Sequence, residues 1–182
     1  VAQGAAMMTE TTVTTELIGG CYNTLPNQVL NRVLEDNLLN FVGGPGYDDK
    51  DFAFARELQA TVPQGQIDAA IARSEEFTGD NRVLVTKPMR TFDHKGMVMG
   101  SSDVGDVANM LPTSMLWGAT WPVGIAHHSW QAVSSSGSSL GLKGAILAGK
   151  TLAAAAFDFA ASPALVAEAA QEFASARGGK PY

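Results

Sequence analysis

Glycine and proline residues divide this chain into short segments with helical periodicity, and this division constrains the fold most strongly. After Pro26, apolar residues recur at helical spacing as far as Phe41, and Asn27 is a plausible N-cap. A Gly-Gly-Pro-Gly run stops that segment, and Ser162 followed by proline is typical of a helix start. The predicted helices cover residues 27–41, 48–62, 66–77, 142–161 and 163–177.

Three stretches favour β-strands between these helices. Residues 9–18 are rich in β-branched side chains, residues 82–86 form a short apolar run, and residues 113–121 resemble a core strand. A serine- and glycine-rich stretch at 134–141 is predicted to be a loop. The pattern predicts an α/β fold with more helix than strand.

Composition excludes several classes of function. The net charge is −6 and no basic stripe is visible, so a nucleic-acid partner is not expected. No uninterrupted apolar run reaches the roughly 18 residues that span a bilayer, and no signal peptide is recognisable. The single cysteine, Cys21, rules out an internal disulfide and is interpreted as a buried structural thiol. We therefore expect a cytoplasmic protein without a membrane partner.

The histidines are the first candidates for chemistry. His127 and His128 are adjacent in the stretch WPVGIAHHSWQ, directly after the predicted strand at 113–121. Adjacent residues of an extended chain point to opposite sides, so at most one of them should enter a metal site. The third histidine, His94, lies in a polar stretch beside a glycine and is interpreted as part of a turn.

Two further motifs leave alternatives open. In the stretch GSSDVGDV, Asp103 or Asp106 could orient a histidine or a metal, or Ser101 or Ser102 could simply cap a helix. Residues 144–151, GAILAGKT, match the phosphate-loop pattern, which would make the protein a nucleotide binder. Helix-forming and apolar residues fill that motif, which favours a packed helix instead.

The motifs SSDVGDV, ATWPVG, HSWQ and GSSLG occur in succession. This succession resembles the aminoacylase and glutamate-carboxypeptidase-like metallopeptidases, and within them the group of amidohydrolases formed by the B subunits of p-aminobenzoyl-glutamate hydrolase. The resemblance covers the whole chain and is least distinctive at 44–80. It implies that residues 25–182 are the C-terminal part of a metallopeptidase-like catalytic domain. Residues 1–24, a helix end and a strand that cannot bury a core alone, would be the end of a ferredoxin-like lid that often mediates dimerisation.

The resemblance also implies a mechanism. Two divalent ions, zinc or manganese, would activate a water that attacks the amide of an N-acyl amino acid such as p-aminobenzoyl-glutamate. The histidine of the HSWQ motif, His128, matches a metal ligand, whereas His127 stands where the group often has glycine. Asp103, Ser102 and Asn27 match positions beside the active site, facing the substrate or supporting the ligands.

The remaining ligands and the general-base glutamate of the family lie in a part that these residues do not include. We therefore expect this chain alone to be inactive and the longer protein to form a homo- or hetero-oligomer. One alternative is a non-catalytic fragment used for its fold or for association. The other is the nucleotide binder suggested by residues 144–151.

Overall fold

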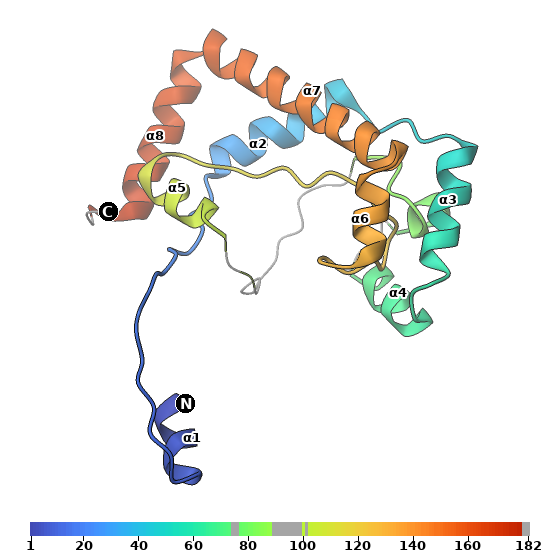
Figure 1. Ribbon diagram of the computed structural model, residues 1–182. Helices are drawn as coiled ribbons and strands as arrows, with labels where there is room; N and C mark the ends of the chain where they lie inside the picture. The colour runs from blue at the N-terminus through green and yellow to red at the C-terminus, as the bar shows by residue number, and fades with distance from the viewer. Residues whose placement is uncertain (74–76, 89–99, 101, 180–182) are drawn as a thin grey trace.

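The computed structural model describes residues 1–73, 77–88, 100 and 102–179, and its regular elements there are all helices (Figure 1). A π-helical turn, η1, continues α2, and a short 3-10 helix, η2, follows α4. In chain order the elements are α1 (Ala2–Met8), α2 (Gln28–Asn37), η1 (Leu38–Val42), α3 (Asp49–Gln59), α4 (Gln64–Ile71), η2 (Gly79–Arg82), α5 (Val104–Met110), α6 (Trp130–Ser136), α7 (Ser139–Ala161) and α8 (Pro163–Arg177).

The predicted helix starts are confirmed where a side chain caps the helix. Asn27 accepts a hydrogen bond from the backbone N–H of Leu30, and Asp48 forms a capping box with Asp51 at the start of α3. Ser162 caps α8, with Pro163 as its first residue, and Gly178 ends α8 in the left-handed conformation. These starts could be predicted because capping depends on side chains only a few residues apart.

The predicted α/β fold class is wrong, because no strand forms among the residues that the structure describes. Residues 113–121 run extended, but their backbone pairs with another segment only at an isolated parallel bridge between Pro26 and Thr113. Residues 9–18 are exposed and have no neighbouring strand within the described part of the chain. A strand requires a partner ladder, and β-branched side chains alone do not supply one.

The stretch at 82–86 is a turn rather than a strand because its backbone bonds are local. Leu84 N–H donates to Asp80, and Thr86 N–H donates to the side chain of Asn81. The predicted loop at 134–141 is also wrong. It contains the end of α6 and the start of α7, which Ser138 caps by accepting from Leu140 N–H.

α7 connects the buried clusters of the molecule. Near its C-terminal end Ala155 packs with Val33 and Leu34 of α2, and near its N-terminal end Leu140 packs with Ala55 and Leu84. A further cluster joins α3 to α6. Figure 1 shows α7 running from the α8 and α2 side of the molecule to the α6 and α3 side.

α1 takes no part in these clusters. None of its residues is buried, and Figure 1 shows it at the end of a long extended segment, away from the other helices. α7 differs from the expectation in another way, because by length and composition it could cross a membrane. One such helix is weak support for a membrane protein, since core helices of soluble proteins pass the same test.

The two glycines of the phosphate-loop pattern have different surroundings in α7. A Cβ atom at Gly144 would lie 2.5 Å from the Thr120 side chain and 3.2 Å from the Ala119 carbonyl oxygen. A Cβ atom at Gly149 would meet nothing within 4 Å. Gly144 therefore lets α7 approach the extended segment closely, and Gly149 does not serve this purpose.

This difference predicts opposite effects of the same substitution. Gly144→Ala should destabilise the chain by about 1–3 kcal/mol through overpacking. Gly149→Ala, the matched control in the same helix, should stabilise it by about 0.5–1 kcal/mol through helix propensity. Urea unfolding followed by circular dichroism measures both, and equal effects of the two variants would contradict this packing.

Candidate functional site

The histidine pair lies in a turn between the extended segment and α6. Gly124 occupies the turn with φ of 90°, and the buried Ile125 anchors it. Ser129 fixes the exit, because its hydroxyl donates to Ala126 O at 2.7 Å and accepts from Ala132 N–H as the N-cap of α6.

The two histidines have different surroundings in this turn. The His127 ring meets Trp117 and Trp121 edge-on, with ring centroids 5.8 and 5.3 Å apart. His128 is exposed and adopts a left-handed backbone with φ of 59°, a conformation that non-glycine residues rarely take. Such strain clusters at functional sites, so the backbone singles out His128.

The described residues do not by themselves fit a metal site. No group of three or more His, Cys, Asp or Glu side chains gathers within the part of the chain that the structure describes. His128 can therefore offer one imidazole, whereas catalytic metals usually need three protein ligands. His94 lies outside the described residues, and Cys21 is exposed rather than buried as predicted.

The loop before α5 has a local structural role. The Ser102 hydroxyl accepts from Val104 N–H at 3.2 Å, and the Asp106 carboxylate accepts from Tyr22 N–H at 2.9 Å. Asp103 is exposed and makes no capping bond to α5. The helix-cap alternative thus accounts for Ser102, while Asp103 faces solvent.

Asn27 is a buried structural residue. Its side chain is 2% exposed, caps α2 and donates to the Ala169 carbonyl of α8 at 2.9 Å. Both ends of its amide are thus occupied by backbone groups, and the side chain joins α2 to α8. The structure places Asn27 within this helix contact and brings neither Ser102 nor Asp103 into hydrogen-bonding contact with it.

The phosphate-loop alternative does not agree with the structure. Residues 144–151 lie inside α7, with Lys150 in the middle of the helix. Backbone N–H groups there are engaged within the helix and cannot cradle a phosphate.

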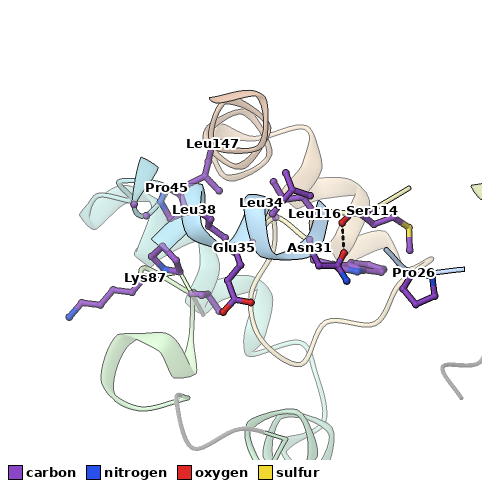
Figure 2. Close-up of a pocket in the computed structure, with 18 of the residues that line it drawn as sticks. Pro26, Asn31, Leu34, Glu35, Leu38, Pro45, Lys87, Ser114, Leu116 and Leu147 are labelled. Atoms are coloured by element: carbon purple, nitrogen blue, oxygen red, sulfur yellow. Dashed lines mark hydrogen bonds between the residues drawn. The ribbon is translucent and has the colours of Figure 1, made fainter. Parts of the chain in front are cut away.

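A pocket of about 550 Å³ lies between α2, η1 and the extended segment, and no sequence motif indicated it (Figure 2). Its walls include Leu34, Leu38 and Leu147, and Ser114 donates a hydrogen bond to Asn31 at one side. Trp117 lines this pocket and also contacts His127, which links the pocket to the histidine turn.

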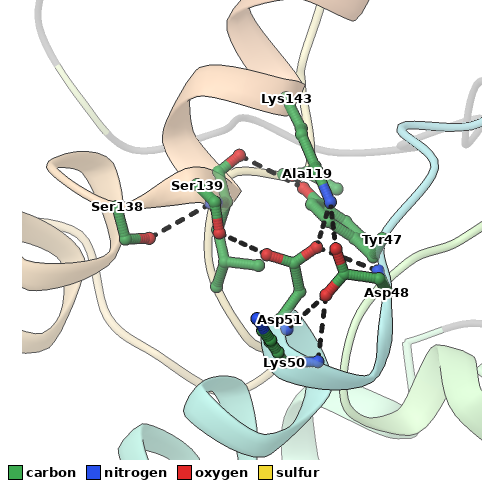
Figure 3. Close-up of polar contacts among 9 residues, drawn as sticks. Tyr47, Asp48, Lys50, Asp51, Ala119, Ser138, Ser139 and Lys143 are labelled. Atoms are coloured by element: carbon green, nitrogen blue, oxygen red, sulfur yellow. Dashed lines mark hydrogen bonds and ion pairs between the residues drawn. The ribbon is translucent and has the colours of Figure 1, made fainter.

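A polar cluster holds the other end of the extended segment (Figure 3). Asp51, which is 2% exposed, accepts hydrogen bonds from Ser139 and Lys143 of α7, and Lys143 also pairs with Asp48 at 3.0 Å. Tyr47 donates to the Ala119 carbonyl. This cluster ties the start of α3 to α7 and to the residues that lead into the histidine turn.

The electrostatics of the cluster follow from burial and pairing. Burial raises the pKa of Tyr47 to about 12, and the nearby Asp51 charge adds to the effect. Burial of Asp51 favours a higher pKa, but hydrogen bonds from Lys143 and Ser139 outweigh it and lower the pKa. The hydrogen bond from Lys143 likewise lowers the pKa of Asp48, and both carboxylates raise the pKa of Lys143.

The lowered pKa values predict a loss of stability in acid. The stabilisation from Asp48 and Asp51 is present above their ordinary pKa of 3.8 and is lost as the pH falls through the lower folded values. Asp51→Asn should lower the melting temperature at pH 7 and flatten its decrease below pH 4. Asp49→Asn, at the exposed neighbouring position, is the control, and thermal unfolding at several pH values compares them. Identical profiles for the two variants would refute the role of Asp51.

Comparison with known proteins gives one clear relative. No protein-family model and no solved structure matches the chain. The chain is 31% identical over 192 residues to the B subunit of p-aminobenzoyl-glutamate hydrolase from Escherichia coli strain K12, a match that covers 100% of this chain and 40% of that protein. The chain thus spans less than half the length of this relative. The similarity confirms the resemblance carried by the motifs, and the chain belongs to the family of p-aminobenzoyl-glutamate hydrolase B subunits.

Proposed function

We propose that this chain is part of a metal-dependent amidohydrolase that cleaves N-acyl amino acids such as p-aminobenzoyl-glutamate. The observation that carries the proposal is the similarity of the whole chain to a protein named as one subunit of a hydrolase. The HSWQ motif, which follows the histidine turn, supplies the residue on which the chemistry of this part depends.

In this proposal His128 is the metal ligand of the chain. Its imidazole is exposed, and its backbone is held in the left-handed conformation between the buried Ile125 and the N-cap Ser129. His127 is engaged with two tryptophan rings and acts as a support of the turn. The other ligands and the general base would come from polypeptide outside these residues.

The active protein is proposed to be an assembly. The name of the relative gives it the letter B among the subunits of a hydrolase, which is the basis for expecting a second kind of polypeptide in the assembly. A site built from several segments agrees with a described chain that offers a single exposed imidazole at the histidine turn and gathers no three metal-binding side chains.

The first prediction concerns the chain of residues 1–182 by itself. It should release no p-aminobenzoate from p-aminobenzoyl-glutamate, with or without added manganese or zinc, because one imidazole does not hold a catalytic metal. Chromatographic detection of p-aminobenzoate measures this. Turnover above the rate with metal alone would contradict the incomplete site.

The second prediction separates the two histidines in the protein that the complete reading frame encodes. His128→Ala should lower kcat/KM by at least about 100-fold and reduce the bound metal, as expected when coordination is disturbed. His127→Phe, which keeps a ring against Trp117 and Trp121, is the matched control and should retain metal. Metal content by mass spectrometry accompanies the kinetics, and a His128→Ala protein with normal metal and activity would overturn the assignment.

A further inference from the structure

The outer side of α7 is apolar along its whole length. Four of its large apolar side chains are half or more exposed, namely Leu142 (62%), Ile146 (50%), Leu152 (52%) and Phe157 (73%). The other exposed residues between positions 140 and 161 are alanines, Gly149 and Lys150. A helix that faces water normally carries charged and polar residues on that side.

The shape of this face suits a helix. Ala145, Gly149 and Ala153 follow one another at intervals of four residues, which leaves a shallow groove along α7. Ile146 and Phe157 stand on one side of the groove and Leu152 on the other, at helical spacing. Rows of this spacing accept the ridge of a second helix.

Lys150 restricts the identity of the occupant. Among the exposed positions of α7, all of them described by the structure, it is the only charged residue, and it lies near the middle of the helix. A second copy crossing symmetrically there would bring two lysines together, which is unfavourable. A bilayer would have to accept a charge near its centre, at a cost on the order of 2.5–3.5 kcal/mol. A protein face with a carboxylate opposite Lys150 has neither cost.

The relative shows where such a face can come from, because the chain covers 40% of its length. We infer that the outer face of α7 is a docking surface for an apolar helix with a carboxylate opposite Lys150, contributed by the part of the protein that corresponds to the rest of that relative. This inference goes beyond the proposed hydrolase activity and does not depend on metal binding by His128.

Cysteine labelling tests whether the face is covered. Ile146→Cys is compared in the 182-residue chain and in the protein that the complete reading frame encodes, with a maleimide reagent and mass spectrometry of the modified peptide. Glu57→Cys, at a charged and exposed position of α3, is the control. We expect position 146 to react at least about tenfold more slowly in the longer protein, since buried side chains are excluded from the reagent, and position 57 to react alike in both.

Each other outcome overturns the inference. Equal rates at position 146 in both proteins would show an uncovered face. Slow labelling of the 182-residue chain that dilution relieves would show a second copy, and protection that needs phosphatidylcholine vesicles would show a membrane. A reading frame that encodes nothing further would also contradict it.

Variants of Lys150 test the charge. In the longer protein Lys150→Glu should restore fast labelling at position 146, because two carboxylates would then face each other. Lys150→Met keeps the length of the side chain without its charge and should preserve most of the protection. Equal protection in the two variants would contradict the carboxylate opposite Lys150. His128→Ala should leave the labelling unchanged, so failure of the hydrolase proposal would be recognised separately.

Discussion

The close approach of α7 to the extended segment at Gly144 is the contact on which the rest of the structure depends. A side chain at this position would collide with Ala119 and Thr120. Through this approach the segment is held against a long helix rather than within a sheet, and Ser135 of α6 completes the attachment by donating to the Thr120 carbonyl at 2.8 Å. The histidine turn begins directly afterwards, so its position follows from helix packing.

The polar cluster at the start of α3 makes the same attachment from the opposite side. A buried carboxylate without partners would be costly, but Asp51 has Ser139, Lys143 and the N–H of Asp48 as donors. Because Tyr47 of the same cluster bonds to Ala119, the charges at the start of α3 and the route of the chain into the site are coupled. A fully satisfied network of this kind specifies one arrangement of its elements.

The sequence predicted those features that local chemistry determines. Asn27, Asp48 and Ser162 each cap a helix within a few residues, so their roles were visible without knowledge of the fold. Residues 113–121 were predicted to be a strand, but whether a strand forms depends on a partner far away in the chain, which periodicity cannot show. The serine-rich stretch failed for a related reason, since Ser135 is buried against the carbonyl of Thr120, 15 residues away, and not exposed in a loop.

The candidate site was predictable only to the extent that motifs carry it. His128 was singled out by resemblance, and its left-handed backbone now gives it a physical distinction from His127 that spacing could not reveal. The exposed imidazole and the apolar outer face of α7 have a common property, because each presents groups that the described residues leave uncovered. An imidazole needs further ligands to hold a metal, and an apolar helix face needs a second surface to leave water. Both requirements are met at once when the chain is completed by more polypeptide of the same family, and this is the simplest physical reason for their occurrence together.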